Sequence, residues 1–364
     1  MKKLAAIILA ALILEGAASA SSAPGTSARS AILIHAGTGE VLYESNADEK
    51  MLIASTTKIM TAVVVLENID IDKIVTIEPG WCGIEGSSMY LKAGEEYSVR
   101  ELLLGMLLVS GNDAACSLAC AAAGDIESFA ALMNEKAAKL GMANSSFKNP
   151  HGLDEDGHYS TARDMARLME YAMANPDFAE ITGCKSYSIG DVSYVNHNKL
   201  LWNCDGCIGG KTGYTKASGR SLVSCCERGG ARYICVTLGD PDDWRDHEAL
   251  YHWAEENYGL RAVIDDECVL SMPVVGGTGN AVKIVPEREV SLFLPKGTEI
   301  QYEIELPRFA FAPCFEGEPA GKIIAYINGE AAATARLVYG HDIDIYPKAK
   351  LTGIERPLWV GRGF

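Results

Sequence analysis

Apolar residues recur at helical spacing through the first two thirds of the chain. In residues 55–68, the spacing of Ile59, Val63 and Leu66 places all three on one face of a helix. The same spacing predicts further helices at residues 99–109, 128–140, 161–174 and 247–258. Short β-branched runs predict two antiparallel strand pairs, 31–35 with 41–43 and 220–226 with 231–238. For residues 31–260 we therefore predict a domain in which helices pack on an antiparallel sheet.

The helical pattern disappears after residue 261. Short alternating or β-branched runs follow at residues 269–275, 281–285, 290–294, 300–306 and 321–327. Turn sequences such as Gly276-Gly277 and Asn328-Gly329 separate these runs. Short strands at this spacing predict a small all-β domain over residues 266–347, with the boundary at 261–266. The expected fold class is therefore α+β.

The N-terminus has the pattern of a signal peptide. Lys2 and Lys3 precede an apolar run at residues 4–14, and Ala18-Ser19-Ala20 fits the small-x-small rule for cleavage. The run is short for a transmembrane helix, although an uncleaved membrane anchor is the alternative. We predict a signal peptide over residues 1–20, a flexible lead over 21–30, and export to the periplasmic or cell-wall side.

The last residues, 350–364, contain Pro357 and no long apolar face. They therefore do not fit an amphipathic membrane-anchoring helix. The chain has 364 residues and a formal net charge of -16. An acidic chain without clustered lysine and arginine argues against nucleic acid as a partner.

The chain has 11 cysteines, an odd number that cannot all pair with one another. An exported chain in an oxidising compartment is expected to form disulfides, whereas a reducing habitat would leave the thiols free. Cys204 and Cys207 have CxxC spacing, which fits a disulfide, half of a metal site or neither. The sequence has no second CxxC and no histidine pair at zinc-site spacing, so we expect no metal.

Three short motifs carry groups suited to catalysis. Ser55 and Lys58 are three residues apart, which puts both side chains on one face at the start of a predicted helix. A serine hydroxyl becomes a good nucleophile when a base takes its proton, and a lysine serves if burial or a second cation lowers its pKa. Alone, the pair also fits a helix-capping serine followed by a solvated lysine.

The second motif, Ser110-Gly111-Asn112, follows an apolar run and exposes a hydroxyl and an amide. The third, Lys211-Thr212-Gly213, lies at the edge of a predicted strand. A lysine and a hydroxyl can bind a carboxylate there, while backbone N–H groups face an oxyanion. Either motif alone fits an ordinary turn.

In this order, the three motifs resemble the SxxK, SGN and KTG set of the serine-type D-Ala-D-Ala carboxypeptidases, the low-molecular-mass penicillin-binding proteins. Further segments are similar to this family at residues 54–62, 110–115, 149–153, 158–164 and 196–201. The resemblance implies a penicillin-binding, β-lactamase-like transpeptidase fold followed by a small all-β domain. It also implies peptidoglycan stem peptides as substrates and β-lactams as covalent inhibitors.

The resemblance implies a role for each motif residue. Ser55 is the nucleophile that forms an acyl-enzyme, and Lys58 is the general base. Ser110 relays the proton, and Asn112 holds the substrate backbone. No metal or organic cofactor is needed, because the serine ester is the intermediate.

The third motif is implied to bind the substrate. Lys211, Thr212 and Gly213 receive the terminal carboxylate, and the backbone N–H groups of Tyr214 and Ser55 form the oxyanion hole. Arg245 lies where the family carries a carboxylate-binding arginine. A surface salt bridge is an equally good interpretation of Arg245, because its surroundings align less well.

Some residues depart from the family pattern. Ala217-Ser218-Gly219 replaces the expected Ala-Gly, which implies a turn one residue longer. We interpret His197 as a surface histidine, and His151 and His158 as structural. Three other functions stay open: a D,D-endopeptidase that cuts cross-links, a β-lactamase-like hydrolase and a non-catalytic wall-binding protein. The sequence does not decide the oligomeric state. It also does not decide whether the protein acts during vegetative growth or during sporulation.

Overall fold

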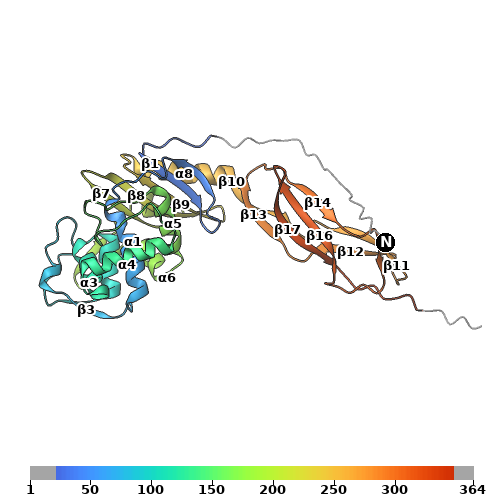
Figure 1. Cartoon of the computed structure of the whole chain (residues 1–364), viewed down its shortest axis with the longest axis horizontal. Coiled ribbons are helices and arrows are strands. Elements are labelled where there is room, and N and C mark those ends of the chain that lie inside the picture. Colours follow the sequence, from blue (N-terminus) through green and yellow to red (C-terminus); the bar gives the residue numbers. More distant parts are fainter. Residues whose placement is uncertain (1–21, 348–364) are drawn as a thin grey trace, which may run out of the picture. The chain divides into compact units, whose positions relative to one another are not determined.

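The computed structural model describes residues 22–347 and divides the chain into two compact units. One unit is Ser21–Gly259, and the other begins at Leu260 (Figure 1). The predicted boundary at residues 261–266 overlaps strand β10, Tyr258–Ile264. The predicted signal peptide and residues 350–364 lie outside the described residues.

The first unit is built on a five-stranded antiparallel sheet (Figure 1). Its strands, in spatial order, are β2 (Val41–Ser45), β1 (Ser30–His35), β9 (Ala231–Leu238), β8 (Gly219–Arg228) and β7 (Cys207–Thr215). The two predicted strand pairs are confirmed. The prediction placed the KTG motif at a strand edge, whereas the motif lies within β7 itself.

Eight α-helices occur in the described part of this unit. They are α1 (Lys58–Asn68), α2 (Val99–Leu108), α3 (Asn112–Ala123), α4 (Ile126–Lys139), α5 (Ala162–Met173), α6 (Pro176–Gly183), α7 (Leu200–Asn203) and α8 (Asp243–Asn257). The five predicted helices are confirmed, with two differences. Helix α8 begins four residues earlier than predicted, and a 3-10 turn at Ala54–Thr57 replaces the first turn expected in α1.

Helices α3, α6 and α7 were not predicted. Helix α3 consists mostly of alanine, cysteine and other small residues on all sides, so no apolar stripe marks it in the sequence. Helix α6 is short and begins at Pro176. Proline suits the first position of a helix, because the missing N–H has no intrahelical acceptor there.

The two faces of the sheet pack against different helices. On β9, Ile234 and Val236 belong to the main core, which also contains residues of α5. The intervening residues face α8, where Tyr233 packs near Tyr251 and Thr237 bonds His247. This alternation follows from the two-residue period of a strand.

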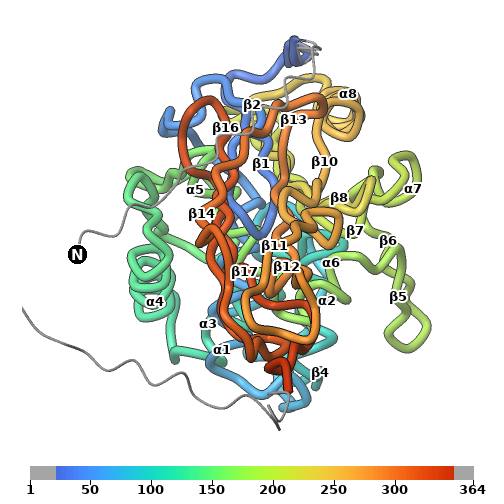
Figure 2. The backbone as a smooth tube through the Cα atoms, turned by 90° about the vertical axis from the view of Figure 1, so that its right-hand side faces the viewer, coloured from blue at the N-terminus to red at the C-terminus, as the bar shows by residue number. Residues whose placement is uncertain are grey.

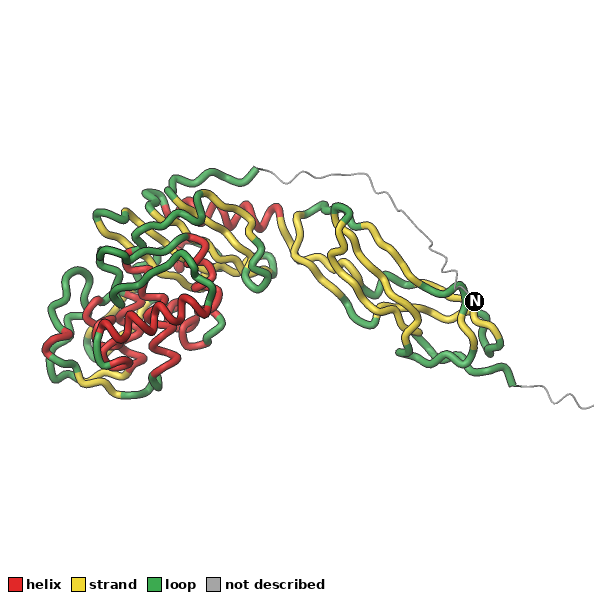
Figure 3. The backbone as a smooth tube through the Cα atoms, in the orientation of Figure 1, coloured by secondary structure: helices red, strands yellow, loops and turns green. Residues whose placement is uncertain are grey.

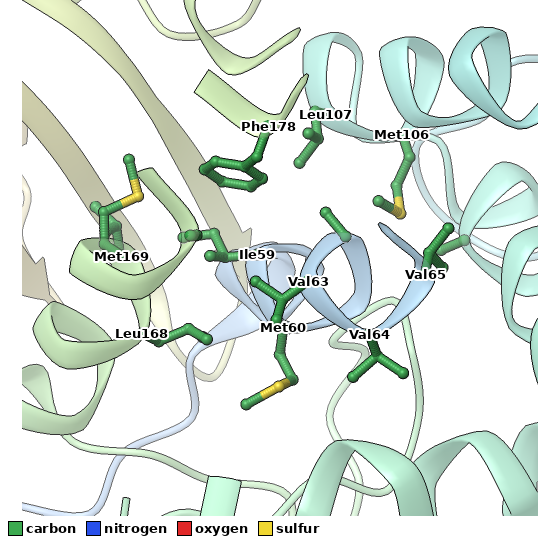
Figure 4. Close-up of a cluster of buried hydrophobic side chains, with 14 of the residues drawn as sticks. Ile59, Met60, Val63, Val64, Val65, Met106, Leu107, Leu168, Met169 and Phe178 are labelled. Carbon is green, nitrogen blue, oxygen red and sulfur yellow. The ribbon is translucent and has the colours of Figure 1, made fainter. Parts of the chain in front are cut away.

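Helix α1 is buried at nearly every position and lies at the centre of the main core. Figure 4 shows Ile59 and Val63 of α1 among Leu107 of α2, Leu168 of α5 and Phe178 of α6. A helix that is apolar all round is stable only when other elements cover every side. The turn immediately before α1 is therefore held rigidly by the core.

Two small antiparallel hairpins complete the unit. Strands β3 (Ile74–Thr76) and β4 (Glu96–Ser98) form one, and β5 (Ser186–Ile189) and β6 (Val192–Val195) form the other. The second hairpin projects away from the body of the unit (Figure 2). Within residues 22–347 no single helix has both the length and the hydropathy to cross a bilayer, and α3 with α4 pass that test only as a pair bent by 83°.

The expected flexible lead is anchored at Ser27, which bonds to Asp246 of α8 and to Asp240, which precedes this helix. Ser27 Oγ donates to Asp240 at 2.6 Å and to Asp246 at 2.9 Å, and its backbone N–H also donates to Asp246. Arg29 then adds its N–H to the end of β9 through Leu238 O. The second half of the lead is therefore held in place, because the buried carboxylates of Asp240 and Asp246 accept hydrogen bonds from Ser27.

Between Leu260 and residue 347, the described part of the second unit consists of strands and loops (Figure 3). Its six-stranded sheet has the order β14 (Gln301–Glu305), β16 (Pro319–Ile327), β17 (Glu330–Tyr339), β12 (Ala281–Pro286), β11 (Leu270–Val275), β15 (Ala310–Phe311). Strand β10 pairs separately with β13 (Val290–Pro295). The all-β prediction is confirmed; β17 was missed because its first half is alanine-rich, which weakens a strand pattern.

Buried His247 makes the stability of the first unit depend on pH. Its ring nitrogens lie 2.7 Å from Ser224 Oγ and 3.1 Å from Thr237 Oγ1. Burial lowers the pKa of His247 to about 3, whereas an unfolded histidine titrates near 6.5. Between these values the unfolded chain binds a proton that the native chain does not. The free energy of unfolding therefore falls as the pH falls from 6.5 toward 3.

We expect His247 to account for about 1 kcal/mol of the stability lost between pH 7.5 and pH 5.5. Urea unfolding at both pH values measures this loss, which should be smaller in His247→Gln. The matched control is His252→Gln, because the His252 ring is exposed on the same helix. An equal loss in wild type and His247→Gln would contradict the prediction.

Candidate active site

A short 3-10 turn brings Ser55 and Lys58 together. The turn spans Ala54–Thr57, and α1 begins at Lys58, so the predicted helix over residues 55–68 does not start at the serine. In a 3-10 turn, side chains three residues apart lie directly above one another. Lys58 Nζ is accordingly 3.0 Å from Ser55 Oγ.

The ammonium or amine group of Lys58 is enclosed by acceptors. Its side chain is fully buried, and Nζ donates to Asn112 Oδ1 and to His151 O, each at 2.7 Å. Burial, followed by the nearby charge of Lys211, lowers the pKa of Lys58 well below its usual value. Lys58 is therefore poised to lose its proton far more readily than a solvated lysine.

The approach of His151 O to Lys58 depends on Gly152. At this glycine φ is +86°, and a Cβ would lie 1.9 Å from Ala54 O and 2.8 Å from Thr57 Oγ1. Only a residue without a side chain fits both the conformation and the space. Ala54 itself has a φ of +47°, so the backbone is also strained directly before the nucleophile position.

Asn112 is fixed by the loop that precedes α2. Its Nδ2 donates to Glu85 O at 2.5 Å, and its backbone N–H donates to Ser87 O at 2.8 Å. The neighbouring Asp113 is buried and accepts from three groups of the same loop: Ser88 Oγ, Met89 N and Leu91 N. The side-chain amide is thereby oriented with its oxygen toward Lys58.

Ser110 holds a hydroxyl with no hydrogen-bond partner among the described residues. Its Oγ is buried, and its φ of +64° is unusual for a residue other than glycine. Ser110 lines the same pocket as Ser55. A buried hydroxyl without a partner can form a hydrogen bond with a molecule that enters the pocket. That bond would replace the hydrogen bonds to water that the hydroxyl lost on burial.

Strand β7 passes close to the nucleophile turn. A Cβ on Gly213 would lie 3.1 Å from Ser55 N, so the glycine permits this approach. Lys211 is almost fully buried and donates to Thr212 O at 2.9 Å, and burial lowers its pKa to about 7. Tyr214 follows with an exposed side chain.

These segments surround a pocket of about 450 Å³. Its lining residues are Ser55, Ser87, Ser110, His197, Thr212, Gly213, Tyr214, Arg220, Asp243 and Trp244. Three buried residues contact the pocket from behind its lining residues. Lys58 bonds to Ser55, Asn112 bonds to Lys58, and Lys211 bonds to the backbone of Thr212. A second hollow, of about 420 Å³, is lined by mutually paired charged residues such as Arg163 and Asp48 and holds no nucleophile.

Arg245 does not line the pocket. Its side chain is 70% exposed and forms ion pairs with Asp242 at 2.8 Å and Asp246 at 3.5 Å on its own helix. The sequence left a surface salt bridge and a carboxylate-binding role open for this residue. The exposure and the two ion pairs of Arg245 favour the surface salt bridge.

Arg220 is the arginine in the pocket wall. It pairs with Asp243 at 2.5 Å, and its guanidinium carbon lies 5.4 Å from the centre of the Trp244 ring. Sequence reasoning missed these residues, because their place in the pocket wall depends on how β8 pairs with β7 and packs on α8. Arg220 shares a strand face with Ser224, which bonds to α8, and it pairs in register with Tyr214 beside the KTG motif.

The other residues singled out in the sequence also have defined places. His197 is exposed, as expected, but at the rim of the pocket. His158 is structural: its Nδ1 accepts from Lys148 N at 3.1 Å, so its Nε2 carries the proton and donates to Thr57 Oγ1 at 2.8 Å. Burial lowers the pKa of His158 to about 4, which keeps it neutral.

The turn after the KTG motif is a three-residue loop. Thr215 pairs with Gly219, and the intervening residues are closed by bonds between Thr215 and Ser218, including Thr215 N to Ser218 Oγ at 3.0 Å. The extra residue noted in the sequence thus supplies the hydroxyl that closes the loop. No group of three or more histidine, cysteine or carboxylate side chains in residues 22–347 is arranged to hold a metal ion.

Comparison with known proteins agrees with this geometry. The sequence model of the D-alanyl-D-alanine carboxypeptidase family, Peptidase S11, matches residues 17–242. D-alanyl-D-alanine carboxypeptidase DacC of Escherichia coli is 34% identical over 343 residues, which cover 88% of this chain and 86% of that protein. DacF of Bacillus subtilis is 31% identical and covers 87% of this chain and 86% of its own.

A solved structure shows the same arrangement of elements. Penicillin binding protein 5 from Haemophilus influenzae superposes with a TM-score of 0.68 at 29% identity, over 89% of this chain and 99% of that chain. The predicted penicillin-binding fold with an all-β C-terminal region is thereby confirmed. The chain belongs to the D-alanyl-D-alanine carboxypeptidase family, peptidase family S11, as its three motifs indicated.

Proposed function

We propose that this chain removes the terminal D-alanine of peptidoglycan stem peptides through an acyl-enzyme formed on Ser55. D,D-carboxypeptidase activity of the penicillin-binding type is the activity of the family to which it belongs. One observation carries the assignment of the nucleophile. Lys58 Nζ lies 3.0 Å from Ser55 Oγ, and it also donates hydrogen bonds to Asn112 Oδ1 and His151 O.

The contacts of Lys58 suit a general base. A neutral amine has two N–H groups and one lone pair. Asn112 Oδ1 and His151 O accept the two N–H groups, each at 2.7 Å. The lone pair is then left for the Ser55 hydroxyl, which donates to it. The depressed pKa of Lys58 favours this protonation state, so the amine can take the serine proton as Oγ attacks the peptide carbonyl.

Ser110 and Asn112 complete the proton path and the substrate contact. The unpaired Ser110 hydroxyl can carry the proton from the lysine to the leaving D-alanine nitrogen. Asn112 holds Lys58 through its oxygen, and its position at the pocket edge suits a contact with the substrate backbone. Neither step needs a metal or an organic cofactor.

The carboxylate and the oxyanion are bound on the β7 side of the pocket. The backbone N–H groups of Ser55 and Tyr214 can stabilise the tetrahedral oxyanion. Thr212 and the charge of Lys211 receive the free carboxylate of the terminal D-alanine. Arg220, rather than Arg245, supplies the guanidinium for that carboxylate, because only Arg220 lines the pocket.

The same chemistry explains inhibition by β-lactams. A β-lactam carbonyl presented to Ser55 would form a penicilloyl ester by the same attack. We also propose that residues 1–20 are a cleaved signal peptide and that residues 31–260 act as the catalytic domain outside the cytoplasmic membrane. Residues 266–347 would form a separate second domain.

Replacement of Ser55 tests the nucleophile and the activity together. Mature protein lacking residues 1–20 should release D-alanine from a diacyl-Lys-D-Ala-D-Ala tripeptide. Ser55→Ala should lower the rate by about 10⁴-fold or more, because it removes the only atom that forms the ester. Ser55→Ala should also fail to retain a fluorescent penicillin.

Three outcomes would contradict this assignment. D-alanine release that persists in Ser55→Ala would remove Ser55 as the nucleophile. Folded wild type that releases no D-alanine, yet cleaves cross-linked muropeptides, would make the chain an endopeptidase. Many penicillin turnovers per second would instead indicate a β-lactamase.

The two buried lysines predict a bell-shaped pH profile for kcat/KM. Activity rises with pH as Lys58 loses its proton, and it falls as Lys211 loses its charge, with a pKa of about 7. Lys211→Arg keeps a positive charge at every working pH. This variant should therefore lose the alkaline limb and keep the acidic limb. An alkaline limb that is unchanged in Lys211→Arg would assign it to another group.

Arg220→Met tests the carboxylate site. Removal of the guanidinium should raise KM for the tripeptide acid by about 10- to 100-fold, since a hydrogen bond to a charged group contributes about 1.5–3 kcal/mol. A tripeptide ending in D-alaninamide should be affected much less. Arg245→Met is the matched control and should leave both substrates unchanged. Equal losses on the acid and the amide would contradict a carboxylate role for Arg220.

A further inference from the structure

Two cysteines outside the active site meet at one backbone carbonyl. Cys226 Sγ donates to Asp205 O at 3.4 Å, and Cys204 Sγ lies 3.8 Å from the same oxygen. The two thiols are also hydrogen-bonded to each other. Cys204 immediately follows α7, and Cys226 lies near the end of β8. All 11 cysteines lie within the described residues and are free thiols in this structure.

An arginine completes this cluster. Arg228 Nε donates to Asp205 O at 2.6 Å, and its Nη2 donates to Cys204 Sγ at 3.5 Å. The hydrogen bond from Cys226 and the charge of Arg228 lower the pKa of the Cys204 thiol despite its burial. Burial raises the pKa of Cys225, the neighbouring cysteine, to about 12. Cys204 is thus the more nucleophilic thiol of this region.

The CxxC neighbour is not the partner of Cys204. The Cys207 sulfur contacts Asn198 Nδ2 at 4.0 Å and Gly209 O at 3.8 Å instead. Cys225 belongs to the main core, on the face of β8 opposite to Cys226. The contacts therefore select one thiol pair from the four cysteines that lie near this end of the sheet.

We propose that Cys204 and Cys226 form a disulfide under oxidising conditions. The Cys204 thiolate attacks a low-molecular-mass disulfide, whose S–S bond breaks and releases one thiol. The Cys226 thiolate then attacks Cys204 Sγ and releases the second thiol. Two protein thiols and one external disulfide become one protein disulfide and two external thiols, so two electrons pass to the oxidant.

This disulfide would close a loop that contains the KTG strand. Residues 205–225 include all of β7 and most of β8, the hairpin that carries Lys211, Thr212 and Arg220. The cross-link would restrict the unfolded chain and tie the start of β7 to the end of β8. The proposal concerns this hairpin's stability and is independent of the catalytic assignment.

Peptide mapping tests the pairing directly. Fully reduced mature protein is incubated with oxidised glutathione at pH 8, quenched with acid, alkylated and digested with trypsin and Asp-N. Cleavage before Asp205 separates Cys204 from Cys207, which no tryptic site does. We expect one cross-linked pair, in which the Cys204 peptide joins the peptide that contains Cys225 and Cys226. We also expect the melting temperature to rise by about 5–10 °C.

The matched variants identify which neighbouring cysteine reacts. Cys225→Ala should keep both the cross-link and the rise in melting temperature, whereas Cys204→Ala and Cys226→Ala should lose both. Three results would overturn the proposal: alkylation of both Cys204 and Cys226 after oxidation, a cross-link to Cys207, or loss of the cross-link in Cys225→Ala. The wild-type map decides the first two even if a variant does not fold.

Discussion

The burial of two lysines within one unit is the constraint on which the site depends. A lysine removed from water loses a large hydration energy, so it must find acceptors or lose its proton. Lys58 has both remedies, because Asn112 Oδ1 and His151 O enclose its Nζ and its pKa is depressed. Lys211 donates to Thr212 O, and burial lowers its pKa to about 7. The charge of Lys211 also lowers the pKa of Lys58. When Lys58 loses its proton, this repulsion disappears and Lys211 can keep its positive charge.

The acceptors around Lys58 come from segments far apart in the sequence, and small residues allow them to converge. Gly152 lets one loop approach the turn before α1, and Gly213 lets β7 approach the backbone of Ser55. Asp113 attaches a third loop to the start of α3 through three donors. The strained backbone of Ala54 persists because α1, immediately after it, is buried on nearly every side. The core thus maintains a geometry that the turn alone would not adopt.

Sequence reasoning succeeded where a periodic pattern exists and failed where tertiary contacts decide. The amphipathic helices and the β-branched strands were predicted, and the motif resemblance identified the family. Helix α3 escaped because its alanines and cysteines have no polar face, and the 3-10 turn at Ser55 has no signature of its own. The place of Arg220 in the pocket wall was not predicted, because it depends on the pairing of β8 with β7 and on which side of α8 faces the sheet. The contacts of the backbone carbonyls of Glu85 and His151 could not be predicted either, because every residue has such a carbonyl and no sequence pattern marks the ones that are used.

One face of β8 connects the features that sequence reasoning could not place. Arg220, Ser224, Cys226 and Arg228 alternate along this strand and all point toward α8. Asp243, at the start of α8, pairs with the first of them, and His247, one turn later, bonds the second. Farther along α8, Glu255 lies 4.0 Å from Arg228, which holds the thiol pair. A single helix therefore supports the pocket wall at one end of β8 and the thiol cluster at the other. A change that loosens the contact of α8 with β8 would therefore affect both the pocket wall and the thiol cluster.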